Sequence, residues 1–224
     1  MSYAPANDPF IITVGAADQL QTSDPWDDTV TSWSGYGYTM DGFTKPDLVA
    51  PGRYLVMPVP MGTHIPATAP DRIVSPGYMW MSGTSFAAPI VSGAAAQILA
   101  RHPDWGPNEV KGALMLTSAY LTGAPDGSAG VGEIDAATAA SLDFTPPSPN
   151  ENFYEFIHSD PVTGQPVFDQ ASWASRVASD ASWSSASWAS ASWASASWAS
   201  ASWSSASWSS DVESSMTSSA SWSE

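Results

Sequence analysis

A serine flanked by very small residues is the first position in this sequence that could do chemistry. Ser85 lies in the stretch GTSFAAP, residues 83–89. A nucleophilic serine needs an exposed hydroxyl, a base that accepts its proton, and donors for the oxyanion that it generates. Small neighbours leave the hydroxyl uncovered, and a helix that starts here would direct free N–H groups toward developing negative charge. The alternative is an ordinary helix N-cap, a common role for serine.

The chain offers three histidines as bases, and none stands in a pattern that identifies it as the partner of Ser85. His64 lies in MGTHIPA and is interpreted as a loop residue. His102 follows the apolar run after Ser85 and suits a helix C-terminus, where a cation is favoured. His158 lies in a Pro-rich segment further along. The sequence therefore predicts a serine nucleophile without an identifiable base in the same chain.

Composition excludes several classes of function. The chain has 6 Lys and Arg against 22 Asp and Glu, which gives a formal net charge of −16. A surface this acidic repels phosphate backbones, so nucleic acid is not expected as a partner. The absence of Cys excludes disulfides, thiolate metal ligands and a Cys nucleophile. No signal peptide is visible after Met1, and no apolar run approaches the roughly 20 residues that span a bilayer.

Strand patterns precede Ser85. FIITVGA, residues 10–16, predicts a strand buried on both faces, and residues 18–47 predict mostly loop. A short apolar stretch, LVAPG, follows. The next stretch, RYLVMPVP, predicts an edge strand, because Pro58 and Pro60 lack the amide donors that an interior strand needs.

Helix patterns follow Gly83. Apolar residues recur at helical spacing and form the stripe Ile90, Val91, Ala94, Ala95, Ile98 and Leu99. A second helix is predicted to start at Pro107, because proline is favoured at the first helical position. A Gly-rich turn then leads into a small final helix within GSAGVGEIDAATAA, residues 127–140. Strands followed by helices that pack on them indicate an α/β fold.

Several of these stretches resemble a known family. SGTSFAAPIVSGAAAQILARHPDWGPNEVKGALMLTSA resembles the segment around the nucleophile of the subtilisin-like serine peptidases (subtilases, peptidase family S8). In that family G-T-S-x-A-x-P precedes an Ala- and Gly-rich helix. PANDPFIITVGAAD, SWSGYGYTMDGFTKPDLVAPG and GVGEIDAATAA are similar to further segments of the family, in the family's order. The resemblance covers about residues 4–142.

The resemblance implies a doubly wound parallel sheet with the serine helix running through its core. It implies Ser85 as the nucleophile, with the backbone N–H of Ser85 as one oxyanion donor, and it implies polypeptide substrates and an extracellular location. Asp47, in KPDLVAPG, falls where some members hold a cation, so the resemblance allows a calcium ion. A single Asp is more often a turn or cap residue, and no metal ligand is assigned.

The resemblance covers only the C-terminal part of the family's catalytic domain. In subtilases the catalytic Asp, the catalytic His and the oxyanion Asn all precede the matched segments. Met61 stands where the family's His-Gly-Thr-His motif has its catalytic His, which excludes His64 as its equivalent, and Asn7 lies inside a matched segment. We therefore expect a serine endopeptidase whose N-terminal half is a required partner. The alternative is a catalytically inactive remnant, or a binding module that acts through its tail.

Three regions are predicted along the chain. Residues 1–143 form the partial catalytic domain, 144–170 a Pro- and Asn-rich linker, and 171–224 a tail of Ala, Ser and Trp. Within the tail Trp recurs every five residues from Trp183 to Trp208. A period of five gives neither a helix nor a strand an apolar face, so the tail is predicted to be disordered. A self-associating or surface-binding repeat that uses exposed Trp is the alternative.

Overall fold

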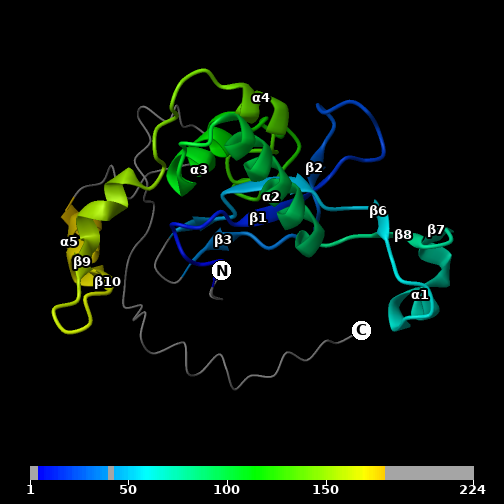
Figure 1. Ribbon diagram of the computed structural model, residues 1–224, viewed down its shortest axis with the longest axis horizontal. Helices are drawn as coiled ribbons and strands as arrows, with labels where there is room; N and C mark the ends of the chain where they lie inside the picture. The colour runs from blue at the N-terminus through cyan, green and yellow to red at the C-terminus, as the bar shows by residue number, and fades with distance from the viewer. Residues whose placement is uncertain (1–4, 40–42, 180–224) are drawn as a thin grey trace.

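A small mixed sheet forms the centre of the fold (Figure 1). The computed structural model describes residues 5–39 and 43–179. In the central sheet β1 (Val14–Asp18) lies between β2 (Thr29–Val30) and β5 (Leu48–Pro51). β5 runs parallel to β1 and β2 runs antiparallel to it. The expected α/β architecture is therefore present, whereas within the described residues the doubly wound parallel sheet is represented by a single pair of parallel strands, β1 and β5.

β1 starts at Val14, four residues later than the predicted strand of residues 10–16. The backbone before it is held by side chains. The Thr13 hydroxyl donates to the carbonyl of Ala6 over 2.8 Å, and the Nζ of Lys111 donates to the carbonyls of Pro9 and Ile11 over 2.6 and 2.9 Å. The carbonyls of Pro9 and Ile11 therefore bind an ammonium group.

Three helices lie against or beside the central sheet. They are α2 (Thr84–Arg101), α3 (Pro107–Leu116) and α4 (Ala136–Ser141). The start of α3 at Pro107 and the small final helix are confirmed. The side of α2 that packs on β1, β5 and α4 buries Ala87, Val91, Ala94 and Ile98. Leu99 was predicted to share this stripe, but its side chain is 41% exposed, because it lies one position beyond Ile98 around the helix.

An arm of residues 53–82 leaves the body between β5 and α2 (Figure 1). Its antiparallel sheet has the order β6 (Leu55–Pro58), β8 (Tyr78–Met81) and β7 (Ile73–Ser75). The predicted edge position of the proline-containing strand is confirmed by β6. The segment between β6 and β7 forms α1 (His64–Thr68) and the 3-10 turn η1 (Pro70–Arg72). His64 therefore begins a short helix, where a loop was predicted.

The segment predicted as a linker packs onto the body. It contains η2 (Glu151–Phe156), β9 (Ile157–Ser159) and β10 (Pro166–Phe168), and it leads into α5 (Gln170–Ser179). Phe153 and Phe156 are buried in the same core cluster as Phe43 and the α2 stripe. The polar composition of residues 144–170 indicated a linker, but burial of these aromatic rings outweighs it.

The predicted tail begins inside α5. Trp173 is fully buried, with its ring 5.6 Å from that of Phe43 and 5.3 Å from that of Phe153, measured between ring centroids. The structure therefore continues past position 171, where the tail was predicted to start. The five-residue Trp repeat from Trp183 onward lies outside the described residues. A short hairpin of β3 (Gly37–Tyr38) and β4 (Thr44–Lys45) completes the strands.

Candidate active site

Ser85 is the second residue of α2, and its side chain is exposed. The N-cap position of this helix belongs to Gly83, so the alternative reading of Ser85 as an N-cap is wrong. Within the described part of the chain, the Oγ of Ser85 makes no hydrogen bond. The hydroxyl thus has the accessibility that a nucleophile requires.

The backbone around Ser85 leaves amide donors free at the helix start. The amide of Gly83 donates to the carbonyl of Gly52 over 2.8 Å, and the amide of Phe86 donates to the carbonyl of Gly83 over 3.0 Å. Phe86 is the first residue of α2 whose N–H finds a carbonyl, and among the described residues the N–H groups of Thr84 and Ser85 have no acceptor. The first turn of α2 also contains no acidic residue. An anion beside Ser85 would meet the positive end of the helix dipole without a competing carboxylate from that turn.

The structure separates Ser85 from the chain's histidines. His102 caps the far end of α2, 17 residues along a helix that rises about 1.5 Å per residue, so the two residues lie roughly 25 Å apart. Its ring stacks on Trp105 at a centroid distance of 3.9 Å. His158 lies in β9 and pairs with Asp169 over 3.3 Å. His64 lies at the start of α1 in the arm, and among the described residues no hydrogen bond joins any of the three histidines to Ser85.

Asp47 is the shared counterion of two buried lysines. Its carboxylate lies 2.8 Å from the Nζ of Lys45 and 3.3 Å from the Nζ of Lys111, and it accepts a hydrogen bond from the amide of Thr13. Burial lowers the pKa of Lys111 to about 8, and the charge of Asp47 limits that fall. A metal ion at Asp47 would have to displace an ammonium group. Among the described residues no group of three His, Cys, Asp or Glu side chains could hold a metal ion.

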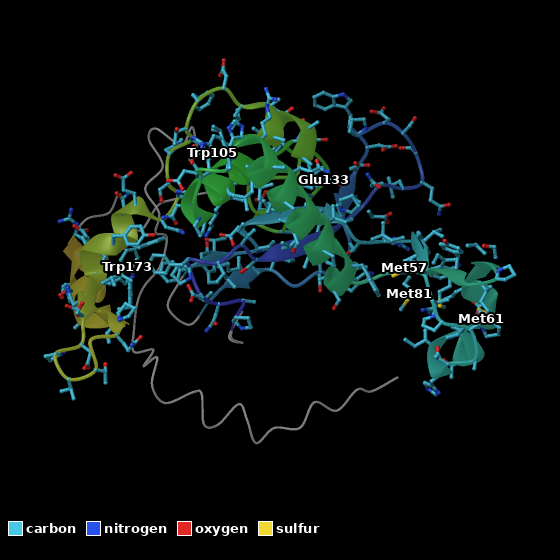
Figure 2. All side chains as sticks on the ribbon, viewed as in Figure 1. Met57, Met61, Met81, Trp105, Glu133 and Trp173 are labelled. Carbon is cyan, nitrogen blue, oxygen red and sulfur yellow. The ribbon has the colours of Figure 1, made fainter. Side chains whose placement is uncertain are left out.

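A second buried carboxyl group was missed by the sequence analysis. Glu133 and Asp28 are both buried, and their side chains form a hydrogen bond. Burial, followed by this bond and the charge of Asp28, raises the pKa of Glu133 to about 8, so Glu133 holds a proton at neutral pH. Figure 2 shows Glu133 in the body of the fold. Its position beside Val49 and Ala119 depends on long-range strand contacts, which no local pattern reveals.

The fold is that of an α/β protein that carries an exposed serine in the first turn of its α2 helix. Residues 1–134 match the model of the Subtilase family, and the chain belongs to that family. The family resemblance of the sequence is thereby confirmed. Within the described residues, no helix is long and apolar enough to cross a membrane.

Relatives agree with this assignment over part of the chain. Serine protease AprX of Bacillus subtilis (strain 168) is 44% identical over 101 residues, which are 45% of this chain and 23% of AprX. Subtilisin-like protease SBT3 of Solanum lycopersicum is 36% identical over 77 residues, 34% of this chain and 10% of SBT3. The crystal structure of fervidolysin from Fervidobacterium pennivorans, described as a keratinolytic enzyme related to subtilisin, matches with a TM-score of 0.50 and 26% identity. That match covers 64% of this chain and 20% of fervidolysin.

The chain thus spans 23% or less of the length of each of these three relatives. What the whole proteins do is therefore not automatically a property of these 224 residues.

Proposed function

We propose that this chain supplies the nucleophile-bearing part of a subtilisin-like serine endopeptidase that acts on polypeptides. The observation that carries the proposal is the exposed Ser85 hydroxyl at the start of α2, where Gly83 holds the capping position. Membership of the Subtilase family and the similarity to a serine protease of Bacillus subtilis support it. An extracellular location is proposed on the same family grounds.

In the proposed reaction, Ser85 Oγ attacks the carbonyl carbon of a peptide bond while its proton passes to a base. The N–H of Ser85 stabilises the negative charge that develops on the carbonyl oxygen. Collapse of the tetrahedral adduct breaks the C–N bond. The amine leaves with the proton, and the acyl group remains as an ester on Ser85. Water then attacks the ester carbonyl, the acyl group leaves as a carboxylic acid, and the Ser85 hydroxyl is restored.

The base, its carboxylate partner and the side-chain oxyanion donor are proposed to come from the part of the catalytic domain that precedes the matched segments in the family. That part belongs either to the same chain or to a second polypeptide. Serine without a base is a poor nucleophile, although oxyanion donors alone leave some catalysis above that of water. We therefore propose that residues 1–224 alone are close to inactive.

A fluorophosphonate probe tests the proposal. The chain is treated with the probe alone, and again after mixing with, or fusion to, the preceding catalytic-domain segment of AprX. We expect labelling on Ser85 only in the second case, and none after Ser85→Ala. Ser92→Ala is the matched control, because Ser92 is also an exposed serine of α2 and its hydroxyl bonds to its own helix, at the carbonyl of Ala88.

Two results would contradict the proposal. Labelling that survives Ser85→Ala would place the nucleophile elsewhere. A complemented, folded protein that is never labelled would favour an inactive remnant or a binding module.

A further inference from the structure

The arm of residues 53–82 has one packed face and one exposed face. The strand register places Leu55 opposite Met81 and Met57 opposite Met79, so these four side chains share one face. Met79 is fully buried, and the other three are partly buried. We call this the inner face. Figure 2 shows Met57 and Met81 together where the arm leaves the body, with Met61 farther out.

The outer face carries the alternate residues of the same strands. Val56 lies opposite Trp80, and Pro58 lies opposite Tyr78. The ring of Tyr54 meets that of Trp80 edge-on at a centroid distance of 5.0 Å. The exposed fractions are 59% for Val56 and 49% for Tyr78. On β7, Ile73 lies opposite Met79 of the inner face, so the next residue, Val74, falls on the outer face, and it is 53% exposed. An exposed apolar and aromatic surface of this kind is typical of an interaction site in soluble proteins.

The composition of the arm differs from that of the rest of the chain. Its only acidic residue is Asp71, out of 22 in the protein, and it holds four of the eight methionines, at positions 57, 61, 79 and 81. It also contains two of the six basic residues, and each packs on an aromatic ring. The guanidinium of Arg53 lies 4.8 Å from the ring centre of Tyr54, and that of Arg72 lies 4.9 Å from the ring centre of Trp80.

Protein interfaces are enriched in aromatic residues, Met and Arg and are depleted of Lys, Glu and Asp, and the arm follows this composition. In a chain with a net charge of −16, a surface nearly free of carboxylates is also where a bound apolar segment would cover the fewest charged groups.

The outer face is directly connected to the serine position. β8 ends at Met81, and only Ser82 and Gly83 separate it from α2. The hydroxyl of Ser82 accepts a hydrogen bond from the amide of Tyr54 over 3.0 Å, which ties the first residues of the arm to the start of the helix. Tyr78 lies seven residues before Ser85, a span of at most about 25 Å of extended chain. A polypeptide with its scissile bond at Ser85 is therefore within reach of the outer face.

We propose that the outer face, formed by Tyr54, Val56, Trp80, Tyr78 and Val74, is a docking surface for an apolar segment of the polypeptide substrate, some residues away from the scissile bond. This inference rests on the proposed function, since it takes the substrate of Ser85 as the occupant. It implies that long substrates gain affinity from the arm, whereas peptides of a few residues do not reach it.

The test measures binding in the full 224-residue chain carrying Ser85→Ala, so that no turnover is needed. The probe is an uncharged, fluorescein-labelled 15-residue peptide with Leu and Phe at alternate positions, and its counterpart has Ser at those positions. Fluorescence anisotropy is expected to show binding of the first peptide only. Val56→Lys and Tyr78→Lys should each weaken that binding by about tenfold or more, because a charge would then be buried under the ligand.

Val162→Lys is the matched control, because Val162 is 89% exposed and lies between β9 and β10, away from the arm. It adds the same charge and should change the affinity by less than about twofold. If circular dichroism shows that Val56→Lys or Tyr78→Lys does not fold, Val74→Lys repeats the test on the third strand.

Other occupants give different results. Undiminished binding in the arm variants, or no binding of the apolar peptide at all, would overturn the proposal. So would a dimer, seen by sedimentation, that Val56→Lys dissociates, or apolar-peptide binding that appears only after residues 180–224 are removed.

A failure of the proposed function gives a different result from a failure of the docking proposal. If the complemented protein lacks fluorophosphonate labelling while the apolar peptide still binds through the arm, Ser85 is not the nucleophile and the surface serves another polypeptide.

Discussion

The amide of Gly83 donates a hydrogen bond to the carbonyl of Gly52 over 2.8 Å, which joins the end of β5 to the start of the helix that carries Ser85. Gly52 has no room for a side chain, because a Cβ there would stand 2.5 Å from the Cβ of Ala16 in β1. Ala16 is itself fully buried. The position of Ser85 relative to the sheet therefore depends on a contact that only very small residues permit.

Gly52→Ala should destabilise the protein. The added methyl group meets the Cβ and the backbone of Ala16, and relief of such overpacking typically costs about 1–3 kcal/mol of unfolding free energy. Urea unfolding followed by circular dichroism measures the change. The control is Gly93→Ala in α2, where a Cβ meets nothing within 4 Å. That variant should gain about 0.5–1 kcal/mol, because alanine is the better helix former. Equal stability of the two variants would show that the contact at Gly52 is unimportant.

Lys111 should make the protein more stable as the pH rises above about 8. Burial lowers its pKa to about 8 from an ordinary value of 10.5. Between these values the unfolded chain binds more protons than the folded one, so the unfolding free energy rises with pH, by at most about 1.4 kcal/mol per pH unit.

The measurement for Lys111 is urea unfolding from pH 7.5 to 10 for the parent chain and for Lys111→Met, which cannot titrate. The unfolding free energy of the parent minus that of the variant should increase across the range. A difference that is flat or decreasing would contradict the shifted pKa. The comparison isolates the contribution of Lys111, because the two proteins differ only at this residue.

Glu133 should make the protein less stable as the pH rises, and it should do so at lower pH than Lys111 acts. Its pKa is raised to about 8 from an ordinary value of 4.5, and burial also raises the pKa of Asp28. Between 4.5 and 8 the folded protein binds more protons than the unfolded chain, so the stability that this pair contributes is lost as the pH rises.

Glu133→Gln keeps a group that can donate a hydrogen bond to Asp28 but does not titrate. We expect thermal unfolding of this variant to depend less on pH between 5 and 8 than that of the parent chain. Glu151→Gln, at an exposed position in η2, is the control and should leave the dependence unchanged. A steeper pH dependence for Glu133→Gln would exclude a shared proton between Glu133 and Asp28.

Local patterns predicted the elements around the candidate site well. The start of α3 at Pro107 and the edge position of β6 follow from the missing amide proton of proline, which acts within one element. The exposure of Ser85 follows from the small size of its neighbours. These features depend on residues close together in the chain, so the sequence is sufficient to predict them.

Contacts between distant residues could not be predicted in the same way. Asp28 and Glu133 lie far apart in the sequence and meet only in the folded protein, and so do Asp47, just before β5, and Lys111 of α3. Asp28, Glu133 and Lys111 stand in no local pattern that distinguishes them from solvated surface residues, and the sequence around Asp47 indicates a turn or cap residue. Their burial depends on tertiary packing, which also determines their pKa values.

A substitution at Trp173 distinguishes a packed α5 helix from the start of a low-complexity tail. Its side chain is fully buried, and its ring lies 5.0 Å from that of Phe156 and 6.1 Å from that of Phe168. Trp173→Ala should lower the unfolding free energy by about 3–5 kcal/mol, because it leaves a large cavity among aromatic rings. Trp26→Ala, at a site that is 76% exposed, should change it by less than about 0.5 kcal/mol. Urea unfolding of both variants makes the comparison, and equally small effects would mean that α5 does not belong to the folded body.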